Sequence, residues 1–174
     1  MHYFDVSVTP AMLFSLSCLP MTQSHLAALD ILQRKMMRRI VGWRSLPGED
    51  WRDTMLRMNH RLQTAQVQYY CEPWSIRFAR NQWRYVKHLI HGPISLWART
   101  LCKYNWNPHF DPTSNHEPFR APGHPRTRWD DHIHDFCRAQ WPHYGVRHWF
   151  DILVDVYMND FEDEFVVFMC GERS

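Results

Sequence analysis

Two adjacent aspartates, Asp130 and Asp131, are the residues whose types and spacing most suggest catalysis. Clustered carboxylates hold the magnesium ions of enzymes that use two-metal chemistry. Here the spacing favours a helix start instead, because Thr127 lies three residues before Asp130. A threonine at that position caps an early amide, and acids favour the positive end of the helix dipole. We therefore predict no catalytic residue, with Thr127 as the helix cap and Trp129 as a buried anchor.

A zinc site is the second possibility, since the chain contains 12 histidines and 5 cysteines. The best candidate ligands are His132, His134, Cys137 and His143. However, His132 and His134 are two positions apart in a predicted helix and face different ways. The sequence also has no Cys-x-x-Cys pair to anchor a metal and no glycine-rich loop to hold a phosphate. We therefore predict no metal, no cofactor and surface histidines.

The cysteines are odd in number and widely scattered, at Cys18, Cys71, Cys102, Cys137 and Cys170. This pattern favours reduced thiols in an intracellular protein, nuclear or cytoplasmic, over a disulfide framework. The apolar run Val6 to Leu19 is too short to cross a bilayer, and no Lys or Arg precedes it as in a signal peptide. We expect no membrane partner, and the sequence leaves the oligomeric state open.

Charge is distributed unevenly along the chain. Residues 1–150 carry 19 Lys and Arg against 11 Asp and Glu, whereas residues 151–174 carry one Arg against seven acids. A basic body with an acidic tail suggests a polyanionic partner for the body. So small an excess of Lys and Arg over Asp and Glu is more commonly explained by solvated surface cations.

The elements that must position these residues read as helices separated by Pro and Gly. We predict a mainly α fold, a small bundle of about five to six helices that allows a short strand near the N-terminus. Thr22 caps a helix that ends near Val41 before Gly42, and a second helix follows Pro47. The others run from about Trp74 to Gly92, 95–104, 128–140 and 146–161, with a loop at 105–126.

Two predicted helices carry cations on one face. In the helix after Thr22, an apolar stripe (Leu26, Leu29, Leu32, Met36, Ile40) lies opposite Arg34, Lys35, Arg38 and Arg39. In the helix from Trp74, the cations fall within an arc of about 80° and Trp83 lies on the apolar side. These cations are Arg77, Arg80, Arg84 and Lys87. Such a ridge can follow a phosphate backbone, and a solvated face is the alternative.

Three segments, in this order, resemble the C-terminal region of non-LTR (LINE-type) retrotransposon reverse transcriptases. They are LDILQRKMMRRIVGW (29–43), RNQWRYVKHLIHGP (80–93) and GHPRTRWDDHI (123–133). The family pattern is matched at Gln33, Arg34, Met36, Arg38, Ile40, Gly42, Arg80, Trp83, Arg84, His88, Gly123, Pro125, Thr127, Arg128, Trp129, Asp131 and Ile133. The resemblance covers about residues 8 to 149, and its three motifs are more specific together than singly.

The chain also departs from the family. His124 replaces a usual arginine, and the catalytic Tyr-x-Asp-Asp hairpin is absent, so the fingers and palm are expected to lie before Met1. The resemblance implies a remnant of the segment leaving the palm (1–21), a thumb-like helical bundle (22–104), a Pro/His-rich basic loop (105–126), and a C-terminal helical pair (127–161). An acidic tail (162–174) matches no part of the family pattern.

The resemblance implies a non-catalytic nucleic-acid-binding remnant that grips RNA or an RNA–DNA duplex, with DNA also possible. The basic residues of both helices would contact the backbone, as would Arg126 and Arg128 in the stiff loop before Trp129. Thr127, Trp129 and Trp83 would anchor the structure. The alternative is a helical protein-interaction or orphan domain with no nucleic-acid role.

Overall fold

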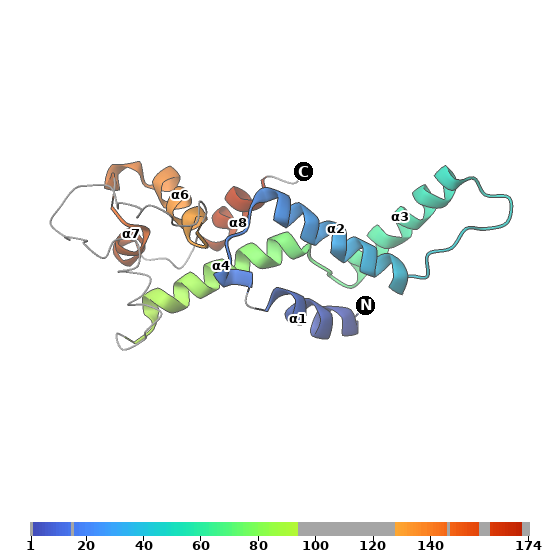
Figure 1. Ribbon diagram of the computed structural model, residues 1–174, viewed down its shortest axis with the longest axis horizontal. Helices are drawn as coiled ribbons and strands as arrows, with labels where there is room; N and C mark the ends of the chain where they lie inside the picture. The colour runs from blue at the N-terminus through green and yellow to red at the C-terminus, as the bar shows by residue number, and fades with distance from the viewer. Residues whose placement is uncertain (1, 15, 94–127, 146, 157–160, 172–174) are drawn as a thin grey trace. The chain divides into compact units, whose positions relative to one another are not determined.

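A computed structural model describes residues 2–14, 16–93, 128–145, 147–156 and 161–171. Within these ranges the chain forms seven α-helices and three short π or 3₁₀ segments and contains no strand, so the predicted mainly α class is confirmed (Figure 1). The strand allowed near the N-terminus is wrong, because the π segment η1 (Phe4–Val8) and helix α1 (Thr9–Leu13) occupy that stretch. The predicted helix at 95–104 and loop at 105–126 lie outside the described residues.

The other helices are α2 (Gln23–Ile40), α3 (Trp51–Gln68), α4 (Trp74–His91), α6 (Asp131–Gln140), α7 (Trp149–Asp155) and α8 (Glu162–Cys170), with 3₁₀ turns η2 (Leu16–Cys18) and η3 (Pro142–Tyr144). The chain divides into two compact units. The N-terminal unit comprises Met1–Leu16 and Met21–Phe78, and the C-terminal unit comprises Ser17–Pro20 and Ala79–Ser174. The division falls within α4, after Phe78.

Both ends of α2 follow the predicted signals. The Thr22 hydroxyl accepts a hydrogen bond from the His25 N–H at 3.3 Å, and the Thr22 N–H donates to His25 Nδ1 at 3.2 Å. This reciprocal pair satisfies amides that have no partner inside the helix. Gly42 follows the helix with a φ of +73°, a backbone conformation that glycine adopts without a Cβ clash.

The buried face of α2 differs from the predicted stripe. Leu32 and Ile40 are 39% and 49% exposed, whereas the helix turns Asp30 and Gln33 inward beside Met37. On a helical wheel the observed face is rotated by about 70° from the predicted one. The apolar stripe is therefore only partly buried, with Leu26 as its one buried member.

Hydrogen bonds to the start of α4 explain why two polar side chains point inward. Asp30 accepts from both the N–H and the hydroxyl of Ser75, at 2.9 Å and 2.8 Å. Gln33 accepts from the Trp74 N–H at 3.1 Å and donates to the Glu72 carbonyl at 2.9 Å. The first amides of a helix need partners from elsewhere, and buried polar groups need partners too. Asp30 and Gln33 of α2 therefore fix where α4 begins.

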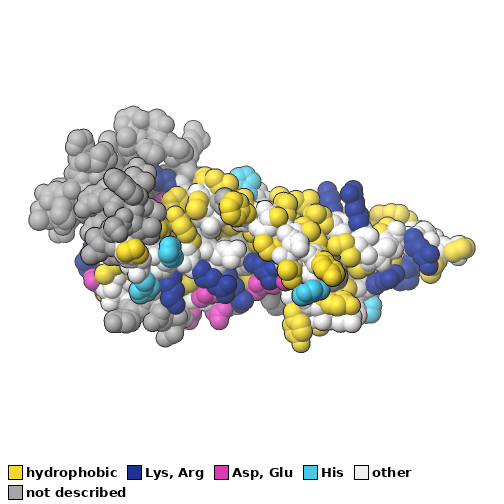
Figure 2. Space-filling model, turned by 90° about the horizontal axis from the view of Figure 1, so that it is seen from below, with side chains coloured by type: hydrophobic (Ala, Val, Ile, Leu, Met, Phe, Trp, Pro, Cys, Tyr) yellow, Lys and Arg dark blue, Asp and Glu magenta, His cyan; other side chains and the backbone are white. Residues whose placement is uncertain are grey.

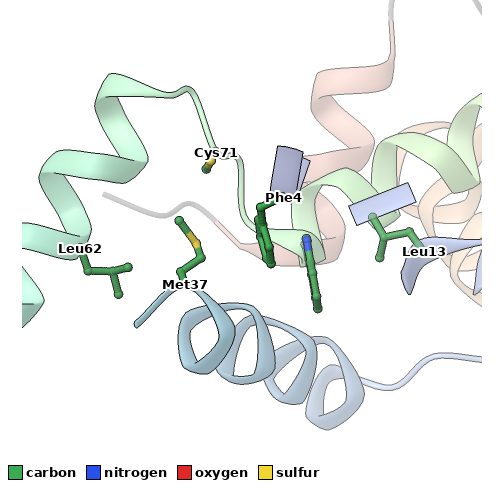
Figure 3. Close-up of a cluster of buried hydrophobic side chains, with 6 residues drawn as sticks. Phe4, Leu13, Met37, Leu62 and Cys71 are labelled. Carbon is green, nitrogen blue, oxygen red and sulfur yellow. The ribbon is translucent and has the colours of Figure 1, made fainter. Parts of the chain in front are cut away.

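The core of the N-terminal unit is formed by side chains from η1, α1, α2, α3, the connection after α3 and the start of α4 (Figure 3). Its buried members are Phe4, Leu13, Met37, Leu62, Cys71 and Trp74. Phe4 stacks on Trp74 with ring centroids 5.8 Å apart, and the Trp74 indole N–H donates to the Thr9 hydroxyl at 3.0 Å. The N-terminal segment thus packs on the first turn of α4.

A carboxylate holds the connection between α2 and α3 against α3. Glu49 accepts two hydrogen bonds of 2.7 Å from the Arg57 guanidinium, one of 2.8 Å from the Thr54 hydroxyl, and one of 3.1 Å from the Leu46 N–H. The Arg57 hydrogen bonds are the largest cause of a Glu49 pKa lowered to about 2. Glu49 therefore stays ionised far below neutral pH and ties the connection to the first turns of α3.

The C-terminal unit is built on an aromatic cluster from three helices. Trp83 of α4 stacks on Phe165 of α8 at 5.0 Å, and Phe136 of α6 meets both rings edge-on at 5.4 Å and 5.3 Å. All three side chains are at most 2% exposed. Edge-to-face and offset-stacked rings add to the free energy gained from burying their apolar area.

Two C-terminal helices depart from the predicted boundaries. The helix predicted from Arg128 begins at Asp131, with Asp130 as its N-cap, so Thr127 is not at the cap position. Thr127 itself lies outside the described residues. The helix predicted over 146–161 is the shorter α7, and the segment predicted as an acidic tail contains α8.

Candidate nucleic-acid interface

The exposed face of α2 presents three cations without neutralising partners. Arg34, Lys35 and Arg39 are exposed, as their position opposite the apolar stripe predicts. Within the described residues none of their side chains forms a hydrogen bond or ion pair. An exposed cation that is not paired with a carboxylate can bind a phosphate without first breaking an ion pair.

Arg38, the fourth predicted cation of α2, is held at the edge of this face. Its Nη2 donates to Asn59 Oδ1 of α3 at 3.1 Å, and its guanidinium lies over the Trp43 ring at 5.1 Å from the centroid. A guanidinium over an aromatic face gains cation–π energy and keeps its charge. Arg38 therefore links α2 to α3 and contributes positive charge beside Arg34, Lys35 and Arg39.

A pocket of about 570 Å³ opens between the end of α2 and α3. Apolar side chains of α2 and polar, basic and aromatic side chains of α3 line it, among them Ile40, Val41, Arg61, Thr64, Gln68 and Tyr69. Arg61 is exposed, and the described residues offer it no carboxylate partner. Pockets of this size accommodate small molecules or single nucleotides. Arg61 was not among the predicted binding residues, although its spacing from Arg57 in α3 places both on one helix face.

The predicted cationic ridge of α4 is occupied by carboxylates. Arg77, in the N-terminal unit, forms a two-bond ion pair with Asp5, at 2.6 Å and 3.2 Å. In the C-terminal unit, Arg84 lies 3.1 Å from Glu162, and Arg80 lies 3.4 Å from Asp163 and 3.9 Å from Glu162. Three of the four predicted ridge cations are thus paired. Lys87, the fourth, is half-buried.

The difference between paired and unpaired cations is visible on the surface. Figure 2 shows dark-blue Lys and Arg side chains beside magenta acidic ones on part of the visible face, and others that have no magenta neighbour there. The acidic partners of Arg80 and Arg84 come from a segment 78 to 83 residues further along the chain. No local sequence pattern reveals pairing at that distance.

The loop before α6 is described only from Arg128 onward. Arg128 is half-buried, and its backbone N–H donates to Asp131 Oδ2 at 2.7 Å. Arg126 and Thr127 lie outside the described residues, as does the whole of the predicted basic loop (105–126). The roles assigned to Arg126 and Arg128 stay predictions.

The predicted tryptophan anchors differ in burial. Trp83 is 1% exposed at the centre of the aromatic cluster. Trp129 is half-buried, meets Tyr85 and Trp149 edge-on, and its carbonyl accepts a 2.6 Å hydrogen bond from Gln82 Nε2. Trp129 is therefore less buried than the predicted anchor, whereas Trp149, which contacts it, has no exposed area. The sequence signal for Trp149 was its place ahead of Ile152 and Leu153 in an apolar helix.

The Asp130–Asp131 pair is used inside the C-terminal unit. Asp130 is 2% exposed, and its Oδ2 accepts a hydrogen bond from the Trp149 indole at 2.9 Å. Asp131 accepts from the Arg128 N–H. Both carboxylates thus have structural partners, and Asp130 is a packing residue of the unit rather than an exposed helix-end acid.

The candidate zinc ligands form no metal centre in the described part of the chain. No group of three or more His, Cys, Asp or Glu side chains there is close enough to hold a metal ion. His134 is buried, which lowers its pKa, and the Arg138 charge lowers it further. Burial also raises the pKa of the Cys137 thiol. The side chains of His134 and Cys137 therefore lie on the buried face of α6. The prediction of surface histidines is wrong for His134.

No protein-family model matches this chain, and comparisons with curated proteins and with solved structures find no significant similarity. Among the described residues, no helix combines the length and the apolar character needed to cross a bilayer.

Proposed function

We propose that this chain is a non-catalytic, nucleic-acid-binding remnant of a non-LTR reverse transcriptase, and that the exposed face of α2 contacts the phosphate backbone. The observation that carries this proposal is the set of exposed α2 cations, Arg34, Lys35 and Arg39, whose side chains have no carboxylate partner within the described residues. The family resemblance of residues 29–43 falls on the same helix and supports the assignment.

The dimensions of the α2 face fit a nucleic-acid backbone. Arg34 to Arg39 spans about 7.5 Å at roughly 1.5 Å per residue. Each strand of duplex DNA presents about one negative charge per 3.4 Å of the axis, so this stretch faces roughly two phosphates of one strand. Arg61 and Tyr69 in the neighbouring pocket add a cation and an aromatic ring, which suit a phosphate and a base.

The contacts of Asp130 and Asp131, the one pair of adjacent aspartates in the sequence, agree with a binding role without catalysis. A two-metal polymerase needs carboxylates that are free to hold magnesium. Asp130 is buried against the Trp149 indole, and Asp131 accepts a backbone hydrogen bond. Primer extension by the purified chain that stops on Asp130→Asn and Asp131→Asn substitution would contradict this part of the proposal.

A salt titration tests the binding role. We expect the labelled RNA–DNA duplex to bind the wild-type chain with an affinity that falls as KCl rises. The triple variant Arg34→Ala, Lys35→Ala, Arg39→Ala should bind more weakly and flatten the log K against log salt slope by about 2–3, since each phosphate contact contributes about 0.9. Helicity should persist, because alanine favours helix.

The control removes a paired cation that lies just before α7. Arg147 lies 2.9 Å from Asp155 in an ion pair, so Arg147→Ala should leave the salt slope unchanged. If the triple variant keeps the wild-type helicity and the wild-type salt slope, the exposed face of α2 is a solvated surface and does not bind nucleic acid.

A protein-interaction domain is the second candidate, and exposed aromatic side chains of the N-terminal unit favour it. Trp51 at the start of α3 is 74% exposed, and Tyr70 just after α3 is 89% exposed. Aromatic side chains are enriched at protein interfaces. A wild-type chain that binds no RNA, DNA or hybrid duplex at low salt would favour this candidate.

A further inference from the structure

The first turn of α8 places acidic side chains directly on the basic face of α4. Glu162 contacts Arg84 through both oxygens, at 3.1 Å and 3.5 Å, and lies 3.9 Å from Arg80. Asp163 lies 3.4 Å from Arg80. Two residues of one acidic turn therefore occupy two arginines that the sequence presents as a phosphate-binding ridge.

The buried aromatic cluster holds these carboxylates in place. Phe165, three residues after Glu162, stacks on Trp83, which lies between Arg80 and Arg84 in the sequence of α4. Phe165 and Met169 of α8 are at most 1% exposed. Because the apolar side of α8 is locked in the core, its acids meet the arginines without a further cost of ordering a flexible segment.

Binding of a phosphate backbone to this face of α4 would be unfavourable. It would have to displace Glu162 from Arg84, and it would be repelled by carboxylates well within the Debye length of about 10 Å. The α2 cations Arg34, Lys35 and Arg39 carry no such acidic neighbours among the described residues. The same ligand therefore experiences two very different basic surfaces on one chain.

We infer that Glu162 and Asp163 determine which surface of this chain binds nucleic acid: they close α4 to phosphate and leave α2 as the binding face. The two carboxylates occupy the positions on Arg80 and Arg84 that phosphate groups would otherwise take. This inference rests on the proposed nucleic-acid-binding function, and it adds the residues that decide where binding occurs.

One substitution and its neighbour provide a charge-matched test. Glu162→Gln removes the carboxylate that pairs with Arg84, whereas Glu164→Gln removes the same charge from an exposed position with no ion pair within the described residues. With the labelled RNA–DNA duplex, Glu162→Gln should bind more tightly and steepen the salt slope by about 1, since each new phosphate contact contributes about 0.9. Glu164→Gln should keep the wild-type slope.

A second pair of variants locates the new contacts. Arg80→Ala with Arg84→Ala should leave wild-type binding unchanged but abolish the gain in the Glu162→Gln background. Asp163→Asn, at an 86% exposed side chain, should give a smaller gain and does not threaten the fold. Each variant should retain the wild-type helicity, and circular dichroism checks this.

The outcomes separate this inference from the proposed function. If the wild-type chain and all variants fail to bind, the proposed function is wrong. If the wild-type chain binds through α2 but Glu162→Gln and Glu164→Gln behave alike, the function stands and the inference is overturned. Loss of wild-type binding on Arg80→Ala with Arg84→Ala would overturn the inference as well.

Discussion

The indole N–H of Trp149 donates a 2.9 Å hydrogen bond to Asp130, and both side chains are buried. An aspartate just before α6 and a tryptophan at the start of α7 therefore satisfy each other inside the C-terminal unit. Removing one partner leaves the other buried without this hydrogen bond, and this asymmetry makes the pair measurable.

Asp130→Ala should lower the free energy of unfolding by about 1–3 kcal/mol, the cost of a buried indole donor left unsatisfied. Chemical denaturation followed by circular dichroism measures it. The exposed Asp135 of α6 serves as the control, and Asp135→Ala should change stability by no more than about 0.5 kcal/mol. Trp149→Phe removes the donor, so its effect should be smaller in the Asp130→Ala background; strictly additive losses would disprove the coupling.

Gln33 of α2 should be more important for stability than any exposed glutamine. Gln33→Ala leaves the Trp74 N–H and the Glu72 carbonyl without their α2 partner, and should cost about 1–3 kcal/mol in the free energy of unfolding. Gln63→Ala replaces an exposed glutamine of α3 and should have almost no effect. Equal stability of the two variants would show that the start of α4 does not depend on α2.

The Glu49–Arg57 pair predicts a pH dependence of stability. The Glu49 pKa is lowered in the folded chain from 4.5 to about 2, so its contribution is fully present above 4.5 and is lost as pH falls towards about 2. Glu49→Gln should therefore destabilise the chain at neutral pH, and its difference from wild type should narrow across that acidic range. Urea denaturation at a series of pH values measures this difference. Asp53→Asn in the exposed first turn of α3 is the control, and a gap independent of pH would contradict the assignment.

Trp83→Ala should destabilise the chain far more than Trp51→Ala. Trp83 is 1% exposed within the aromatic cluster, so its loss should cost about 3–5 kcal/mol, as for other buried large aromatics. Trp51→Ala removes a side chain that is 74% exposed and should leave the thermal midpoint nearly unchanged. Similar midpoints for the two variants would mean that the cluster does not hold α8 on α4.

Signals carried by neighbouring residues were readable from the sequence. Thr22 with Gly42 marked both ends of α2, and Gly92-Pro93 marked the end of α4, because capping and helix breaking depend on a few adjacent residues. The mainly α class followed from helical spacing of the apolar residues. The exposed cations of α2 were predicted for the same reason.

Long-range contacts were not readable. The inward turn of Asp30 and Gln33 depends on hydrogen bonds to residues 39 to 45 positions away, so an apolar pattern alone chose the wrong face. Helix α8 was missed because its run of acids hides a short apolar pattern, Phe165, Val166 and Met169. The pairing of that run with α4 needs the folded chain, because charge counted along the sequence cannot show which charges neutralise each other.

The buried thiols of the chain allow the local opening of each unit to be measured. Cys71 lies in the core of the N-terminal unit and Cys137 in that of the C-terminal unit, both as free thiols, whereas Cys18 is exposed. Burial raises the pKa of both buried thiols, so alkylation in the native state has to wait for a transient opening of the surrounding structure. Pulsed alkylation read by mass spectrometry would then give a separate opening free energy for each unit, with Cys18 recording the unhindered rate.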